Sequence, residues 1–143
     1  RQLTDDKGQK FPDFKNLSKK WSTGAEYIAL YPNVLLGAHR DHAYAIILLP
    51  LSYSETIENV HIYYSQPNTS SSLKKKNKDQ WKEVFEEDIF VVEGMQAGRL
   101  GIKFDGGRFS PKMDEPTHCF HDWVASKVND FRNNNHPISN VTE

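Results

Sequence analysis

The stretch Glu26–Pro50 reads EYIALYPNVLLGAHRDHAYAIILLP and is dense in aromatic and aliphatic residues. Such residues pack well on a pleated sheet and favour strands. Pro32 interrupts the first apolar run, which fits a bulge or an edge position in a strand. The stretch therefore predicts two strands, Glu26–Leu36 and His42–Pro50, which the short link GAHRD joins as a hairpin.

A third apolar run follows at Glu58–Ser65, ENVHIYYS. Val60, Ile62 and Tyr64 recur at every second position, so they share one face of a strand. We therefore expect an antiparallel meander of three strands. The next segment, 65–80, is polar and basic without an apolar period, and it is interpreted as a solvated loop.

The segment Trp81–Gln96, WKEVFEEDIFVVEGMQ, has the period of an amphipathic helix, with Asp79 as its N-cap. At about 100° per residue, an apolar stripe lies within about 80° of the Trp81 direction. This stripe comprises Val84, Phe85, Val91, Val92 and Met95. A second helix is predicted from Asp114–Pro116 to about Phe131. The predicted fold class is α+β, an antiparallel sheet with a long helix packed over it.

Asp88 lies at about 340° on the same wheel, in the middle of the apolar stripe, where a Leu would be expected. A carboxylate that is buried there without a partner would be too costly to keep, so it needs donors, a cation or a metal. Two interpretations are open at this point. Asp88 either lies at a helix end or caps a neighbouring loop, or it takes part in a functional site.

The composition limits the classes of protein to consider. With 143 residues the chain makes one domain at most, and 18 Lys and Arg against 19 Asp and Glu give no basic excess for nucleic acid. The single Cys119 excludes an internal disulfide framework and fits a reducing cytoplasm. No apolar run reaches membrane-spanning length. We expect a cytoplasmic protein with an irregular lead-in 1–24, a main part 25–133 and a disordered tail 134–143.

Two pairs of histidines are candidate metal ligands. His39 and His42 lie near the hairpin link, and on one strand their spacing would point them to opposite faces. His118 and His121 share a helix at i and i+3, which can chelate a metal, but ordinary surface histidines are the preferred interpretation. Asp88 with His118 and His121 is a weaker alternative. A site of two histidines and one carboxylate suits non-haem Fe(II).

A resemblance to a known family rests on four motifs, which are YPNVLLGAHRDHAYAIILLPLS, WKEVFEEDIFVVEGMQAGRLG, FDGGRFSP and DEPTHCFHDWVAS. Together they resemble the C-terminal part of Rieske non-haem iron oxygenase α subunits, the aromatic-ring-hydroxylating dioxygenase family, over roughly residues 22–130. The most specific piece is a helix pattern formed by Asp88, Glu93, Gln96, Ala97 and Gly98. The resemblance implies that Asp88 is the third ligand of the mononuclear Fe(II).

The resemblance also implies a fold, a reaction and partners. The fold would be a fragment of a helix-grip, START-like catalytic domain, with Tyr27 and Val84 as candidate walls of the substrate pocket. The intact enzyme would insert oxygen from O2 into an aromatic or other small organic substrate, as a dioxygenase or a monooxygenase. Electrons would pass from NAD(P)H through a reductase, sometimes with a ferredoxin, to a [2Fe–2S] Rieske cluster. The assembly would be a homotrimer or an α3β3 complex.

The family pattern is incomplete in this chain. The Rieske cluster needs two cysteines and two histidines, whereas the chain has one Cys, and no histidine precedes residue 24 to supply the two further iron ligands. We therefore expect this chain to be inactive alone. The alternative function is a non-enzymatic helix-grip module that binds a small ligand.

Overall fold

The computed structural model describes residues 3–135, so the predicted tail lies outside the described residues from position 136 on. The chain forms two compact units, residues 1–102 and 103–143. The first unit contains all strands and the long helix α1, and the second contains α2. The candidate site is built in the first unit.

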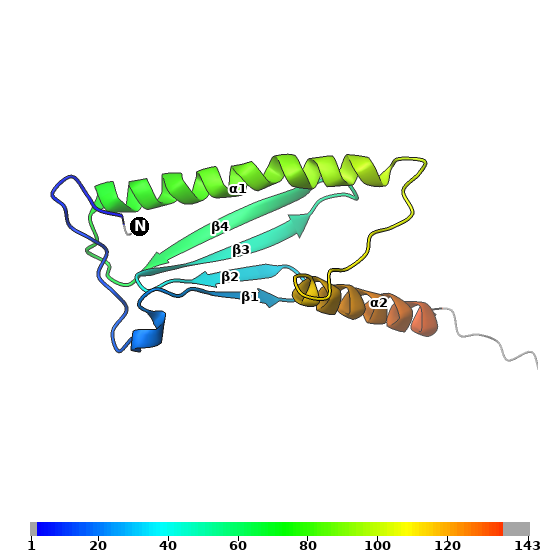
Figure 1. The fold of residues 1–143 in the computed structure, drawn as a ribbon, viewed down its shortest axis with the longest axis horizontal. Coiled ribbons are helices and arrows are strands. Elements are labelled where there is room, and N and C mark those ends of the chain that lie inside the picture. The colour runs from blue at the N-terminus through cyan, green and yellow to red at the C-terminus, as the bar shows by residue number, and fades with distance from the viewer. Residues whose placement is uncertain (1–2, 136–143) are drawn as a thin grey trace, which may run out of the picture. The chain divides into compact units, whose positions relative to one another are not determined.

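The strands form one antiparallel sheet with the order β1-β2-β3-β4 (Figure 1). They span Glu26–Leu30 (β1), Val34–Ala38 (β2), His42–Pro50 (β3) and Thr56–Tyr64 (β4). The prediction of three strands is wrong in one place, because the first predicted strand is two strands with a turn at 31–33. Pro32 lies in this turn, where its fixed φ and missing N–H are tolerated.

Helix α1 spans Ser71–Arg99, so the prediction of a loop up to residue 80 is wrong from Ser71 on. Two residues of this polar segment are buried. Leu73 and Asn77 are 1% and 2% exposed, and they are spaced so that they share one helix face. The lysines between them are good helix formers. Asp79, the predicted N-cap, lies inside the helix and pairs with Lys75.

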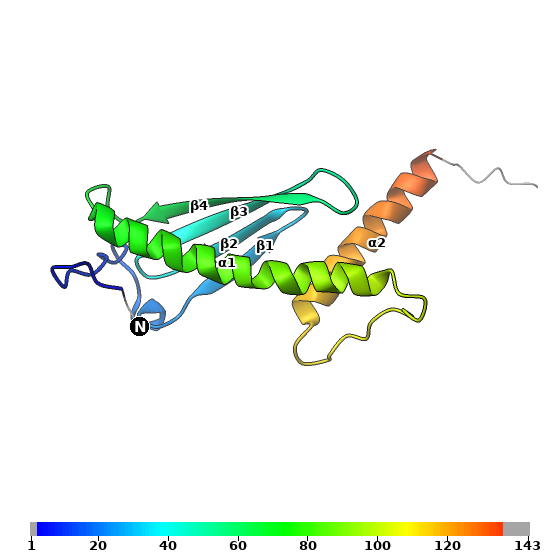
Figure 2. The ribbon, with the colours of Figure 1, turned by 90° about the horizontal axis from the view of Figure 1, so that it is seen from above.

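Helix α1 runs across one face of the sheet (Figure 2). That face carries His42, Tyr44 and Ile46 of β3, which are buried while their neighbours are less so. Phe11, from the segment before the strands, completes this core and stacks on Tyr64 with ring centroids 5.1 Å apart. The core of the first unit is therefore small, and it lies under the N-terminal half of α1.

The segment before β1 is tied to the turn between β2 and β3. The guanidinium of Arg40 donates from Nε to Asp13 Oδ1 at 2.8 Å and from Nη1 to the carbonyl of Ser22 at 2.8 Å. The backbone N–H of Phe14 donates to the carbonyl of Arg40 at 2.8 Å. The short 3-10 helix η1, Lys19–Trp21, lies in this segment. These contacts hold the β2–β3 turn, which carries the histidines described below.

Helix α2 spans Glu115–Asn135, close to the predicted start at Asp114–Pro116 and slightly beyond the predicted end at Phe131. The carboxylate of Asp114 accepts a hydrogen bond from the backbone N–H of Ser110 at 2.6 Å, just before the helix begins. An antiparallel sheet and two helices make an α+β fold, which confirms the predicted class.

Candidate functional site

Asp88 lies on the side of α1 that faces the sheet. The side chains of α1 that pack toward the sheet follow one line along the helix, namely Leu73, Asn77, Trp81 and Phe85. Asp88 comes seven residues after Trp81. That separation is about two turns, so Asp88 points within about 20° of the Trp81 direction. The helical-wheel placement of Asp88 on the apolar face therefore agrees with the structure.

The environment of Asp88 differs from the expectation of a buried carboxylate. Asp88 is exposed, and so is every residue from 86 to 99. Among residues 3–135 its carboxylate makes no hydrogen bond and no ion pair. It lies within α1, so it neither ends the helix nor caps a loop. The physical reason for its exposure is that the packing against the sheet ends at Phe85, which is the last partly buried residue of α1.

Apolar side chains surround this exposed carboxylate. Val91, Val92 and Met95 of the predicted stripe are all more than half exposed, at 54%, 63% and 58%. Within the described part of the chain, the stripe therefore has no cover over its C-terminal half. An accessible carboxylate among apolar side chains is available to a ligand or metal that arrives from outside this unit.

The two predicted pocket residues occupy different elements. Tyr27 on β1 pairs in register with Gly37, which pairs with Tyr44, so Tyr27 lies on the face that α1 covers. Tyr27 is 65% exposed, and its ring meets the ring of His39 edge-on, with centroids 5.8 Å apart. Val84, on α1, is also exposed. A pocket wall formed by Tyr27 and Val84 stays a prediction.

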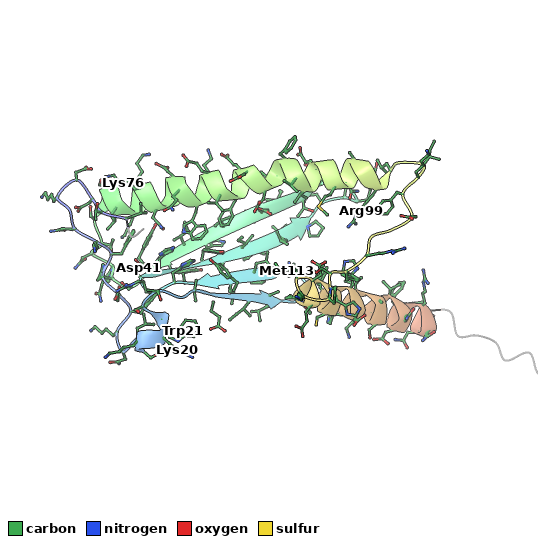
Figure 3. All side chains as sticks on the ribbon, viewed as in Figure 1. Lys20, Trp21, Asp41, Lys76, Arg99 and Met113 are labelled. Atoms are coloured by element: carbon green, nitrogen blue, oxygen red, sulfur yellow. The ribbon has the colours of Figure 1, made fainter. Side chains whose placement is uncertain are left out.

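A chain of buried polar groups links the sheet to α1. The indole Nε1–H of Trp81 donates to Nε2 of His42 at 2.8 Å, and Nδ1 of His42 lies 2.7 Å from Oδ1 of Asp41. Because an indole can only donate, Nε2 of His42 must accept, so Nδ1 carries the proton and donates it to Asp41. Asp41 and His42 are both buried. Figure 3 shows Asp41 at the end of the sheet. We call this arrangement the Asp41–His42–Trp81 chain.

The rings of His39 and His42 stack face to face, with centroids 4.7 Å apart and planes 2° from parallel. The prediction that they point to opposite faces is wrong. They do not share one strand: the register that pairs Ala38 with Ala43 continues to His39 and His42, one on each side of the turn. The backbone N–H of His39 donates to the carbonyl of His42 at 2.9 Å. Cross-strand partners lie on the same face of a sheet.

His39 has a buried nitrogen without a partner. Among the residues that the structure describes, its Nε2 is the one buried side-chain nitrogen or oxygen that makes no hydrogen bond. Burial lowers the pKa of His39, the neighbouring His42 lowers it further, and Asp41 opposes both. The ring also contacts Trp81, at 5.2 Å between centroids. The ring of His39 thus lies beside the Asp41–His42–Trp81 chain in surroundings that favour the neutral imidazole.

Sequence reasoning missed the Asp41–His42–Trp81 chain. One signal was present, since a link as short as Arg40-Asp41 makes His39 and His42 cross-strand partners and directs both toward one face. The contact with Trp81 had no local signal. It joins residues that are distant in sequence, and it depends on where α1 crosses the sheet.

No group of three or more His, Cys, Asp or Glu side chains in residues 3–135 could hold a metal ion. The alternative that combines Asp88 of the first unit with His118 and His121 of the second unit stays a prediction. His118 pairs with Asp122 at 3.2 Å, and both histidines are exposed and lie against the ring of Phe109. Both side chains lie on the exposed surface of α2. Asp88 on its own offers one free carboxylate to a metal.

No helix among residues 3–135 combines the length and the apolar character needed to cross a membrane.

Comparisons with known proteins identify the family. No curated protein and no solved structure matches the chain. A family model described as ring hydroxylating alpha subunit (catalytic domain) matches residues 2–130, a range that includes the whole sheet, α1 with Asp88, and most of α2. The chain therefore belongs to the family of ring-hydroxylating α subunits, and it matches their catalytic domain.

Proposed function

We propose that this chain is part of the catalytic domain of a terminal oxygenase, in which Asp88 supplies a carboxylate ligand to a mononuclear Fe(II). The observation that carries the proposal is the free carboxylate of Asp88. It lies on the side of α1 that faces the sheet, and it makes no hydrogen bond or ion pair within the described residues. The membership in the family of ring-hydroxylating α subunits supports a ring-hydroxylating reaction, and the iron is part of the proposal.

Asp88 can supply one of the three protein ligands of such a site. A carboxylate can complete a ligand set with two histidines and leave coordination positions open. In this proposal Asp88 supplies the carboxylate, and two imidazoles of the intact oxygenase would complete the ligand set. When bound, Fe(II) supplies the activation of dioxygen for insertion into a small organic substrate, either aromatic or of another class such as a quaternary ammonium compound.

The other side chains near Asp88 would exclude water and hold the substrate. Val91, Val92 and Met95 offer apolar surface around the carboxylate, and Tyr27 and Val84 are the proposed walls of the pocket. Pockets for small molecules are mostly apolar with a few placed polar groups. Excluding water strengthens the attraction between the carboxylate and a cation. These side chains would therefore position the substrate and exclude water from the site, and the metal would supply the chemistry.

Electron delivery and assembly follow from the same proposal. The oxygenase would receive electrons from NAD(P)H through a reductase or ferredoxin and a [2Fe–2S] Rieske cluster, and it would assemble as a homotrimer or an α3β3 complex. The chain has one cysteine, Cys119, which is exposed on α2. A Rieske cluster would therefore be held by other polypeptide, and residues 1–143 alone would not turn over substrate.

The test is Asp88→Ala in the oxygenase polypeptide that contains this chain, with Glu87→Ala as the matched control. Glu87 is also an exposed carboxylate of α1, but it lies about 100° round the helix from Asp88. We expect Asp88→Ala to lower mononuclear iron content and turnover by at least about tenfold to a hundredfold, while the [2Fe–2S] absorption stays unchanged. Glu87→Ala should behave like the wild type in all three measurements.

Two results would contradict the assignment. If Asp88→Ala kept its mononuclear iron, another residue would supply the carboxylate. If iron and turnover both survived, Asp88 would have no role in the reaction, and a ligand-binding module without a metal would become the better interpretation. Metal analysis and absorption spectroscopy on the same preparation separate these cases.

A further inference from the structure

We infer that the hydrogen bond from Trp81 to His42, which Asp41 supports, positions Asp88 for the metal. In this inference Trp81 and His42 act through the helix and do not touch substrate or iron. It rests on the proposed role of Asp88 as an iron ligand. The argument starts from where α1 is held and where it is free.

The N-terminal half of α1 is held by two polar links to the sheet. Tyr64 donates from its hydroxyl to the carbonyl of Lys74 at 3.2 Å and to Oδ1 of Asn77 at 3.3 Å. Trp81 donates to His42 at 2.8 Å. No described residue after Trp81 on α1 makes a hydrogen bond to the sheet, so the Trp81 link is the last one before Asp88.

The helix transmits this anchor to Asp88. Trp81 and Asp88 are seven residues apart, which is about 10 Å along the helix axis and about two full turns. Rotating or sliding α1 at Trp81 therefore moves the carboxylate of Asp88 by a similar amount. Phe85 packs between them against Tyr44, with ring centroids 5.5 Å apart. An apolar contact is not directional, whereas a hydrogen bond fixes both distance and angle.

His42 is itself fixed in the form that Trp81 needs. The bond to Asp41 places the proton on Nδ1 and leaves Nε2 as an acceptor. The ring of His39 lies parallel on His42, which prevents the imidazole from tilting. When a group that orients a metal ligand without touching the metal is removed, the affinity for the metal commonly falls about tenfold to a hundredfold. Here the orienting group would act through two turns of helix.

The test compares Trp81→Phe with Tyr64→Phe in the same oxygenase polypeptide. Each change removes one hydrogen-bonding group between the sheet and α1 and keeps an aromatic ring. The hydrogen bond of Trp81 is the one nearer to Asp88, whereas Tyr64 holds α1 further back, at Lys74 and Asn77. Apoenzyme is titrated with Fe(II), the near-infrared ligand-field bands of the bound metal are recorded, and thermal unfolding is measured. We expect Trp81→Phe to raise the Kd for Fe(II) about tenfold and to shift the bands. Tyr64→Phe should change the Kd by less than about twofold, with bands as in the wild type.

A second variant protects the test if one protein folds poorly. His42→Phe should raise the Kd for Fe(II) as Trp81→Phe does. The double variant should bind Fe(II) no more weakly than either single variant, because both substitutions remove the same hydrogen bond. Unchanged Fe(II) binding and bands in Trp81→Phe would overturn the inference, as would an equal effect of Tyr64→Phe. If Asp88→Ala also keeps its iron, it is the proposed function that fails, so the two failures are distinguishable.

Discussion

The two halves of α1 behave as different structures although they form one continuous helix. Residues 71–85 pack on the sheet through side chains that include the fully buried Leu73, whereas residues 86–99 are exposed throughout. The packed half holds the fold of the first unit together. The exposed half carries Asp88 and makes little contribution to the core. Stability and the candidate chemistry are thus separated along a single element.

Hydropathy alone would assign the two halves the opposite way. The packed half begins with the polar run SSLKKKNKDQ, and the exposed half contains the apolar run Ile89-Phe90-Val91-Val92. Burial is decided by which part of the helix meets the sheet, and a few well-placed side chains are sufficient. An apolar surface that remains exposed indicates a binding face. This contrast is what makes the second half the place to look for function.

The largest effect should separate the two halves by stability. Leu73→Ala removes a side chain that is 1% exposed, so we expect it to lower the free energy of unfolding of the chain by about 3 kcal/mol. Val92→Ala removes a side chain that is 63% exposed, so its effect should stay below about 0.5 kcal/mol. Urea unfolding of both variants measures the difference. Similar losses would mean that residues 86–99 are packed in solution.

The strands show how far the sequence predicts this fold. The bounds of β3, His42–Pro50, were predicted correctly because a long apolar run between a short link and a proline leaves few choices. The division of Glu26–Leu36 into β1 and β2 was missed, since Pro32 suits an edge strand and a turn equally well. The first turns of α1 were missed because one leucine and one asparagine give no visible period.

The direction of the Asp88 side chain on its helix was predictable, but its environment was not. The helical wheel places Asp88 correctly on the apolar face, and the motif resemblance connects it with iron. Its exposure could not be foreseen, because the wheel shows which way a side chain points and not how far the sheet extends beneath it. The Asp41–His42–Trp81 chain depends on a contact between distant residues, which no local pattern encodes.

A second prediction exchanges glycine for alanine on the sheet and on the exposed half of α1. A Cβ at Gly37 would lie 2.3 Å from Cζ of Tyr44, whose ring crosses over β2 to contact Trp81. Gly37→Ala should therefore cost about 2 kcal/mol through overpacking. At Gly94 a Cβ meets nothing within 4 Å. Gly94→Ala should stabilise the chain by up to about 1 kcal/mol, because alanine favours a helix.

The sign of each change is the informative result. Thermal unfolding should place Gly37→Ala below the wild type and Gly94→Ala above it. If Gly37→Ala did not change the stability, the ring of Tyr44 would have to move away from residue 37 easily. The aromatic packing between the sheet and Trp81 would then be loose. A destabilising Gly94→Ala would mean that another part of the protein packs closely on the exposed half of α1.

The smallest expected effect is a pH dependence of the stability that arises from His39, beside the packed half of α1. Burial lowers the pKa of His39 below its ordinary value of 6.5, with His42 acting in the same direction and Asp41 against it. In the unfolded chain the same ring takes up a proton near its ordinary pKa. The unfolded state therefore binds more protons below that pH, so the free energy of unfolding falls as the pH drops from about 6.5 toward the lower pKa of the folded state.

His39→Leu should remove this part of the pH dependence, so the variant should lose less stability than the wild type between about pH 7.5 and 5.5. Leu also replaces a nitrogen that is buried without a partner, which limits the cost of the change near neutral pH. Urea unfolding at several pH values gives the comparison, and His61→Gln, at an exposed histidine of β4, controls for the loss of a histidine as such. Equal slopes in wild type and His39→Leu would show that folded His39 takes up its proton freely. Since His39 stacks on His42, and His42 holds Trp81, a confirmed difference would place the acid sensitivity at the anchor of α1 and not in the half that carries Asp88.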